Sequence, residues 1–330
     1  MSLTLTRERL HALLTRASGK RIVVVGDAML DVYLIGEVER ISPEAPVPVV
    51  RVRERRNALG GASNVAENVA AIGCRCNLVA AVGADAAGTT LRTMLGAIGA
   101  DGESLVVIDR PTTQKTRVVA RSQQLVRVDE EDDADLGAVD AGRLLAAVQR
   151  VVAHADALVL EDYNKGVLVP MVIEGAIAAA RAAGIPVIVD PKFRNFFCYR
   201  GATIFKPNRR ELEAALGATA LDDVANLPSV LGRLGVGHLL LTLGEEGMVL
   251  ISAEGEVGRV PTVARSVYDV VGAGDTVTAY LAAILAAGGT PGEAAVIANI
   301  AAGIEVGKLG AQTVTPDEVR AYVDEHALHD

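Results

Sequence analysis

Short runs of aliphatic and β-branched residues recur along this chain, and segments with helical spacing separate them. Such runs are typical of buried strands in a parallel sheet. Their alternation with helices predicts an α/β fold, a doubly wound and mainly parallel sheet with helices on both faces. The strands are expected at Arg21–Val25, Leu78–Val82, Ala157–Leu160, Pro186–Val189, Thr203–Phe205 and Leu239–Leu243. The helices are expected at Ala62–Ile72, Thr89–Ile98, Ala138–Val152, Met171–Ala183, Arg209–Leu216 and Thr276–Ala287.

Two segments interrupt this alternation. Asp31–Asn57 contains three closely spaced prolines, which exclude a helix and favour an edge strand or an extended arm. Thr116–Asp129 alternates polar and apolar residues, as in a strand pair buried on one face. We therefore predict one domain over residues 1–330 that carries a small β-sheet lid, made of segments about 31–57 and 112–130. Such a lid could cover a ligand, join two subunits, or do both.

The overall composition narrows the class of protein. With 330 residues, 50% of them apolar, the chain can bury a large core. A net charge of −9 argues against a nucleic-acid-binding surface. Three cysteines are too few for a disulfide framework, and the apolar segment Thr276–Ala287 is too short to span a membrane. We expect a cytoplasmic protein that binds neither nucleic acid nor membrane.

The segment Asp269–Asp275 has the sequence Asp-Val-Val-Gly-Ala-Gly-Asp and leads into that apolar helix. Unpaired N–H groups at a helix start attract anions, and Gly272 and Gly274 would let a phosphate approach the backbone closely. A carboxylate beside such a site repels a phosphate, so its presence there suggests a separate chemical role. Accepting a proton from an attacking hydroxyl is such a role. The sequence leaves two interpretations of Asp275 open: a general base, or an ordinary helix N-cap.

Two motifs near the N-terminus place polar side chains where ligands are expected. Asp27 and Asp31 follow the first strand, and carboxylates there pair well with sugar hydroxyls, although both could instead lie in a solvated turn. Gly60 and Gly61 precede a helix and permit close approach of a ligand, and Asn64 can donate and accept hydrogen bonds. The alternative is a plain helix start at which Asn64, or the serine before it, acts as a cap.

Two later motifs each follow a strand. Asn208 and Glu211 have the spacing of a capping box, and they could equally orient Mg²⁺-bound waters and nucleotide phosphates. The glycine turn that follows the strand at 239–243 could be a simple hairpin, or it could place Thr242 and the backbone of Gly244 against phosphates. Both motifs are therefore compatible with a nucleotide site.

Two acid–lysine pairs, Asp162 with Lys165 and Asp190 with Lys192, also follow buried strands. One such pair could be a surface ion pair, but two at the same sheet edge are less easily dismissed. An acidic chain that binds an anionic substrate needs local cations, because a desolvated phosphate without a cationic partner is disfavoured. The candidates are Lys165, Lys192 and, on the lid, Arg121.

Three of these motifs occur in a fixed order: Gly-Gly-Ala-x-Asn at 60–64, Pro-Asn-x-x-Glu at 207–211 and Asp-x-x-Gly-Ala-Gly-Asp at 269–275. In this order and spacing they resemble the ribokinase-type (phosphofructokinase B) family of sugar kinases, and the resemblance covers nearly the whole chain. It implies a doubly wound α/β domain with a β lid that often serves as a dimer clasp. It also implies ATP- and Mg²⁺-dependent phosphorylation of a sugar hydroxyl, and it leaves open whether K⁺ binds beside the anion site.

The segments Ile41–Val50, Gln123–Asp129, Asp162–Gly166 and Tyr199–Thr203 resemble one group within this family, the kinase part of the bifunctional proteins of ADP-heptose synthesis. This resemblance implies phosphorylation of D-glycero-β-D-manno-heptose 7-phosphate at C1, giving the 1,7-bisphosphate for the lipopolysaccharide core. Because the chain stops at Asp330, we expect a stand-alone kinase, although a fragment of a bifunctional protein would look similar.

The family resemblance also implies roles for single residues. Asp275 would be the catalytic base, and Gly272, Ala273 and Gly274 would form the anion hole. The nucleotide would be bound by Asn208, Glu211, Thr242, Gly244, Gly247 and Asn299, with Glu211 serving Mg²⁺ through water. The sugar would be held by Asp31, Gly60, Gly61 and Asn64. The family's usual Asn-Pro-Asn begins here with Lys206, which places a cation near the nucleotide.

The expected protein is thus an ATP-dependent sugar-phosphate kinase that forms a homodimer through its lid. Two alternatives stay open: a kinase for another sugar phosphate, and a catalytically silent sugar-binding subunit on the same fold. The presence of Asp275, Glu211 and the glycine pair counts against the silent subunit.

Overall fold

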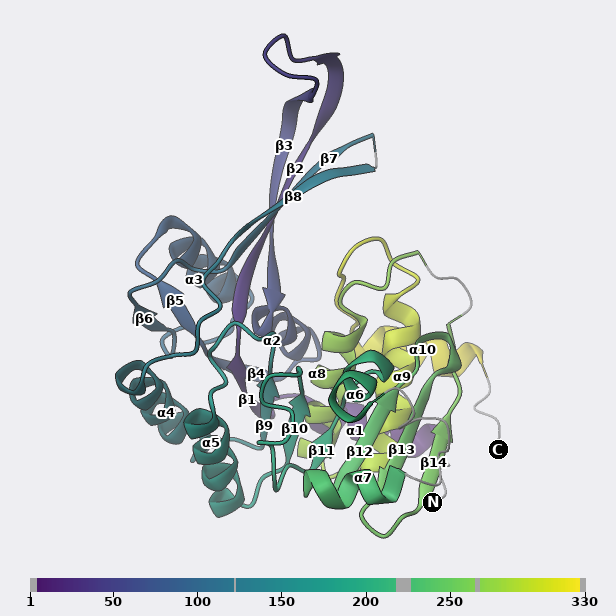
Figure 1. The fold of residues 1–330 in the computed structure, drawn as a ribbon. Coiled ribbons are helices and arrows are strands. Elements are labelled where there is room, and N and C mark those ends of the chain that lie inside the picture. The colour runs from purple at the N-terminus through teal and green to yellow at the C-terminus, as the bar shows by residue number, and fades with distance from the viewer. Residues whose placement is uncertain (1–4, 122, 218–226, 265–267, 327–330) are drawn as a thin grey trace.

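The computed structural model describes residues 5–121, 123–217, 227–264 and 268–326. Residue 122 of the predicted lid and both ends of the predicted domain therefore lie outside the described residues. The main body is an α/β domain from which a narrow β-sheet projects (Figure 1). Among the described residues, no helix combines the length and the apolar character that crossing a bilayer requires.

The central sheet has its strands in the order β14-β13-β12-β11-β10-β9-β1-β4. From β4 to β12 neighbouring strands are parallel, and β13 and β14 are antiparallel additions at one edge. This confirms the predicted mainly parallel sheet. The bounds are β1 (Arg21–Gly26), β4 (Arg75–Val79), β9 (Ala157–Glu161), β10 (Val187–Asp190), β11 (Ile204–Phe205), β12 (His238–Thr242), β13 (Met248–Ser252) and β14 (Val257–Val260).

Helices cover both faces of this sheet, because successive strand residues point to opposite sides. Val24 belongs to one buried apolar cluster, whereas Val23 and Val25 belong to the other. The first cluster packs against α1 (Arg7–Ala17), α2 (Ala62–Ala71), α3 (Ala86–Ala97), α8 (Ala273–Ala286), α9 (Pro291–Glu305) and α10 (Pro316–Glu325). The second packs against α4 (Ala138–Val152), α5 (Pro170–Ala183), α6 (Arg209–Leu216) and α7 (Leu227–Leu234).

The projecting sheet is built from β2 (Ala28–Ile41), β3 (Pro48–Gly61), β7 (Gln114–Ala120) and β8 (Gln123–Glu130), in the order β3-β2-β7-β8. Strands β2 and β3 form a long antiparallel hairpin, β7 runs parallel to β2, and β8 pairs antiparallel with β7. Two of the three prolines lie in the turn of the long hairpin, and Pro48 begins the edge strand β3. These are positions where a missing N–H costs no ladder hydrogen bond.

Two predicted elements have different bounds. The strand predicted at Leu78–Val82 is divided between β4 and β5 (Ala81–Gly83), and β5 pairs with β6 (Val106–Ile108) in a separate small sheet. The helix predicted from Thr89 begins one turn earlier, because Asp85 caps it by accepting a hydrogen bond from the backbone of Gly88 at 2.7 Å.

Candidate active site

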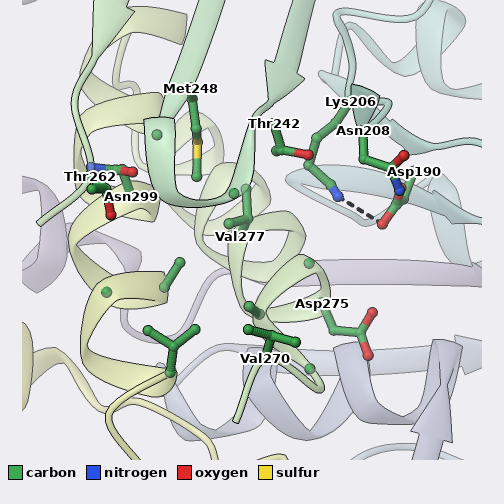
Figure 2. A pocket seen from close by; sticks show the side chains of 18 of the residues that line it. Asp190, Lys206, Asn208, Thr242, Met248, Thr262, Val270, Asp275, Val277 and Asn299 are labelled. Atoms are coloured by element: carbon green, nitrogen blue, oxygen red, sulfur yellow. Dashed lines mark hydrogen bonds and ion pairs between the residues drawn. The ribbon is translucent and has the colours of Figure 1, made fainter. Parts of the chain in front are cut away.

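A cavity of about 670 Å³ opens at the carboxyl ends of β10, β11 and β12 and beside the start of α8. Figure 2 shows Asn299, Thr262 and Met248 toward one end, with Lys206 and Asp190 toward the other. The cavity lies where ligands bind in parallel α/β sheets. Among the predicted site residues it is lined by Asp190, Lys192, Asn208, Glu211, Thr242, Gly244, Gly247, Gly272, Ala273, Gly274, Asp275 and Asn299.

The first turn of α8 faces this cavity. Gly272 is the N-cap residue, with φ 97° and ψ −15°, a conformation that favours glycine. An added Cβ at Gly274 would come no closer than 3.7 Å to another atom, the Nζ of Lys206, so the backbone there is open to a ligand. Asp275 is the third helical residue and makes no capping hydrogen bond, so the N-cap interpretation of Asp275 is wrong.

Asp275 is buried and is held from two other elements. Asn64 Nδ2 in α2 donates to one carboxylate oxygen at 2.5 Å, and the hydroxyl of Tyr163 donates to the other at 2.9 Å. Burial and the nearby Asp190 raise the pKa of Asp275, whereas the two hydrogen bonds lower it, and the net pKa is about 6. The group is therefore a carboxylate at neutral pH with an affinity for protons above that of an ordinary aspartate.

Two more acids and one lysine lie close to Asp275. Glu161 ends β9, Asp190 ends β10, and one oxygen from each of these and from Asp275 lies within 4.8 Å of the others. Lys206 Nζ donates to Asp190 at 2.7 Å. The carboxyl oxygens of Glu161 have no hydrogen-bond partner among the described residues. Burial raises the pKa of Glu161 well above its usual range, with Asp190 and Asp275 reinforcing the effect.

The predicted nucleotide residues at the start of α6 form a capping box. Asn208 Oδ1 accepts from the backbone N–H of Glu211 at 2.9 Å, and the carboxylate of Glu211 accepts from the backbone of Asn208 at 2.8 Å. Lys192 Nζ donates to the other oxygen of Glu211. Burial alone would lower the pKa of Lys192, but Asp190 and Glu211 outweigh it and raise that pKa. The capping-box interpretation holds, and it fixes Glu211 at the cavity wall.

The wall of the cavity continues through the turn after β12. The short 3-10 helix η3 (Gly244–Glu246) connects β12 to β13, so this motif is also a hairpin connection. Gly247 has φ 84°, and an added Cβ would lie 2.1 Å from the carbonyl oxygen of Val260. Across the cavity, Asn299 in α9 donates to the carbonyl of Pro261 at 2.8 Å. The side-chain amide oxygen of Asn299 is a hydrogen-bond acceptor at this end of the cavity.

The predicted sugar residues lie where the projecting sheet joins the domain. Asp31 in β2 pairs with Arg117 in β7, with Nη1 and Oδ1 2.5 Å apart. A Cβ at Gly60 would lie 2.6 Å from the second oxygen of Asp31, so only glycine fits beside this carboxylate. Asn64 follows in the first turn of α2 and reaches Asp275. The helix is not capped by Asn64, because its N-cap residue is Gly61.

Like the residues around Asp31 and Asn64, three further predicted substrate residues do not line the cavity. Asp162 is buried behind it and accepts from the hydroxyl of Tyr199 at 2.8 Å. Lys165 pairs with Glu131 at 2.6 Å. Arg121 is exposed in the turn after β7, at the far end of the projecting sheet. The structure therefore does not bring these side chains to the cavity. Asp27, which the sequence also singled out, is buried and accepts backbone N–H groups from Tyr163, Lys165 and Val167.

Sequence reasoning missed three residues that contact the predicted ones: Glu161, Tyr163 and Arg117. Glu161 continues a buried strand, so the apolar pattern gives no signal for it. Tyr163 lay within a quoted motif, and its contact with Asp275 joins segments 112 residues apart. The period-two pattern of the lid could have singled out Arg117, because it places Arg117 on the same face of the strand as Arg121.

A family model described as pfkB family carbohydrate kinase matches residues 20–318. The chain therefore belongs to this family of carbohydrate kinases. The bifunctional protein HldE of Rhodospirillum rubrum is 48% identical to it over 312 residues, which are 93% of this chain and 63% of that protein. HldE of Citrifermentans bemidjiense is 45% identical over 322 residues, 96% of this chain and 66% of that protein. The chain thus spans less than two thirds of the length of the first of these relatives.

Solved structures show the same architecture. The ribokinase of Arabidopsis thaliana, complexed with ribose and ATP, matches with a TM-score of 0.72 at 22% identity, over 91% of this chain and 97% of that one. Phosphofructokinase-2 of Escherichia coli, in complex with potassium, matches with a TM-score of 0.74 at 20% identity, over 93% and 99%. These matches confirm the predicted ribokinase-like fold.

Proposed function

We propose that this protein transfers the γ-phosphoryl group of ATP to the C1 hydroxyl of D-glycero-β-D-manno-heptose 7-phosphate. One observation carries the proposal: a buried carboxylate, Asp275, lies in the first turn of α8, beside unpaired backbone N–H groups, at the mouth of a cavity large enough for a nucleotide. A proton acceptor next to an anion-binding turn is the arrangement that phosphoryl transfer to a hydroxyl requires.

In the proposed reaction the C1 oxygen attacks the γ-phosphorus as its proton passes to Asp275. The bond from that phosphorus to the β,γ-bridging oxygen breaks, and its electrons leave with ADP. Asn64 and Tyr163 hold the carboxylate in place, each through one of its oxygens. The N–H groups at the start of α8 take up negative charge on the transferring group. Positioning and charge stabilisation then supply most of the rate increase.

The donor atoms around the cavity fit a nucleotide and its metal ion. The volume of about 670 Å³ falls within the roughly 300–1,000 Å³ of typical ligand pockets. Both oxygens of Glu211 are already engaged, by Lys192 and by the backbone of Asn208, so Glu211 would hold Mg²⁺ through water. When bound, Mg²⁺ would offset the negative charge of the nucleotide phosphates. Asn299 and Thr262 would border the base at the far end (Figure 2).

The choice of a heptose phosphate rests on sequence likeness. The segments at 41–50, 123–129, 162–166 and 199–203 resemble the kinase part of proteins of ADP-heptose synthesis, and the HldE relatives match more than nine tenths of this chain. The site supports a hydroxylated substrate next to Asp275, because Asn64 contacts Asp275 and Asp31 lies near the base of the projecting sheet. Whether the second activity of the relatives belongs to another protein is a separate question.

Replacing Asp275 tests the proposal directly. Asp275→Asn keeps the shape of the side chain and removes the proton acceptor, so we expect kcat to fall by about 10²–10⁴ while ATP binding stays close to wild type. Asp156→Asn is the matched control, because Asp156 is a carboxylate paired with Lys20 at the opposite end of β1. Near-normal turnover by pure Asp275→Asn would refute the assignment of the base.

We also propose that the projecting sheet joins two copies of the chain. In β8, Val126 and Val128 lie opposite Val118 and Thr116 of β7, on the face away from Arg127. Val126 and Val128 are 50% and 49% exposed, which is unusual for two apolar side chains on a small sheet. A second copy would cover this apolar face, and the family resemblance implies the same use of the lid.

A further inference from the structure

One row of side chains crosses the whole projecting sheet. Tyr33 in β2 lies directly opposite Arg56 in β3 and Arg117 in β7, and Arg117 lies opposite Arg127 in β8. Residues opposite one another in neighbouring strands share a face of the sheet. Three arginines and a tyrosine therefore lie on the face opposite to the exposed Val126. Figure 1 shows the sheet rising beside the domain, with β2 and β3 leading down to α2.

Two of these arginines converge on the tyrosine. The guanidinium carbons of Arg56 and Arg117 lie 4.7 Å and 5.4 Å from the centre of the Tyr33 ring. Guanidinium groups held over an aromatic ring lose fewer rotamers on binding and keep their N–H donors free at the edge. The pair thus places two planar, permanently charged donors on one small area of the lid.

This area shares a face of the sheet with Asp31, a predicted sugar residue. Asp31 precedes Tyr33 by two residues on the same face, and Arg117 joins the two rows through its ion pair with Asp31. Burial raises the pKa of the Tyr33 phenol, and the carboxylate of Asp269, the first residue of the catalytic motif, contributes to the same rise. Tyr33 is therefore within electrostatic reach of that motif. Asp31 and Tyr33 are two positions apart along β2, so their rows are separated by roughly 7 Å, which is comparable to the span of a sugar.

Charge pairing distinguishes Arg56 from the other cations near the site. Lys165 is paired with Glu131, and Lys192 with Glu211. Arg56, in contrast, is exposed and has no carboxylate partner and no hydrogen-bond acceptor within the part of the chain that the structure describes. An unpaired arginine beside a second one is a suitable site for a phosphate dianion, which guanidinium groups bind through paired hydrogen bonds.

We propose that Arg56 and Arg117 bind the distal phosphate of the sugar phosphate, the phosphate that is not formed in the reaction. This inference rests on the proposed function and names the residues that select a phosphorylated sugar over a free one. The sugar ring would then lie between Asp275 and the lid, with its hydroxyls toward Asp31. Arg117 has enough N–H donors to keep its bond to Asp31 while it binds a phosphate.

The test is the kinetics of Arg56→Ala with Arg55→Ala as the matched control. Arg55 is the adjacent exposed arginine of β3, and its side chain leaves the strand on the opposite face. We expect Arg56→Ala to raise KM for heptose 7-phosphate by about 10- to 100-fold, the worth of hydrogen bonds to a charged group. KM for ATP, and any weak activity on unphosphorylated heptose, should stay close to wild type. Arg56→Lys should fall between wild type and Arg56→Ala.

The outcomes separate this inference from the proposed function. If wild type uses heptose 7-phosphate and Arg56→Ala matches Arg55→Ala for that substrate, the phosphate site is wrong and the proposed function stands. If Arg56→Ala weakens the free and the phosphorylated heptose equally, Arg56 supports the lid rather than the phosphate, and the inference is again wrong. If wild type phosphorylates only unphosphorylated sugars, the proposed substrate falls and the inference falls with it.

Discussion

Asp275 owes its chemistry to an arrangement of buried charges. Asp190 is paired with Lys206, whereas Asp275 forms no ion pair among the described residues, so we propose Asp275 as the carboxylate that accepts a proton. Burial alone would lower the pKa of Lys206, but Asp190 and Glu161 raise it, which keeps this lysine charged. Lys206 stands where the family motif begins with asparagine. The acids around Lys206 account for a lysine at this position, because they would repel one another without a cation.

This arrangement predicts an acid limit to activity. Because the pKa of Asp275 is raised to about 6, its base form is lost as pH falls through that value, and kcat/KM should decline below it. Tyr163→Phe removes a hydrogen bond to the ionised form, so the acid limb should move to higher pH. A pH profile of both enzymes checks this.

The substrate phosphate also titrates near pH 6, but its ionisation in solution is the same for both enzymes. A limb that stays in place in Tyr163→Phe would show that Asp275 is not the group that titrates.

At the scale of elements, the projecting sheet has two faces of different chemistry. One carries Tyr33 with arginines, and the other exposes valines. The strict alternation of a strand assigns each side chain to one face, so one sheet can serve a substrate and a second subunit at once. The sequence left open whether the lid is a cover or a dimer surface, and the two faces support our proposal that it is both.

The dimer proposal predicts a concentration-dependent change in mass. Light scattering of the wild type should give a dimer at micromolar concentration, and Val126→Glu combined with Val128→Glu should give a monomer, because two buried carboxylates would face each other across the interface. Val139→Glu is the control, since Val139 is 78% exposed on α4, away from the lid. A monomeric wild type with full activity would refute the clasp.

At the scale of the whole molecule, the apolar runs were sufficient to predict the parallel part of the sheet, whereas the antiparallel strands β13 and β14 were not predicted. Parallel strands covered on both faces must be apolar throughout, so they stand out in the sequence, and α4 and α6 begin and end where predicted. The division of the strand at 78–82 was not visible, because β4 and β5 are both buried and only the backbone bends between them.

The glycine turns of the site could be predicted from the sequence, whereas most side-chain contacts between distant segments could not. A glycine-rich turn before an apolar helix is a local signal, whereas the bond from Asn64 to Asp275 joins segments 211 residues apart. Arg121 was chosen by extending the period-two pattern of β7, but the strand ends at Ala120 and its pairing shifts after Val118. The pattern therefore stops before Arg121, and the arginine of β7 that pairs with Asp31 is Arg117.

The most direct test of the central claim is turnover of the intact protein with ATP and a panel of sugars. The panel contains heptose 7-phosphate, hexose 6- and 1-phosphates, and unphosphorylated heptose, and ADP release is measured with Mg²⁺ present. We predict that heptose 7-phosphate gives the highest kcat/KM and that the new phosphoryl group is on C1. Preference for a hexose phosphate would change the proposed substrate but keep it a sugar phosphate. ADP release with none of these sugars, or with unphosphorylated heptose alone, would contradict the account of this chain as a sugar-phosphate kinase.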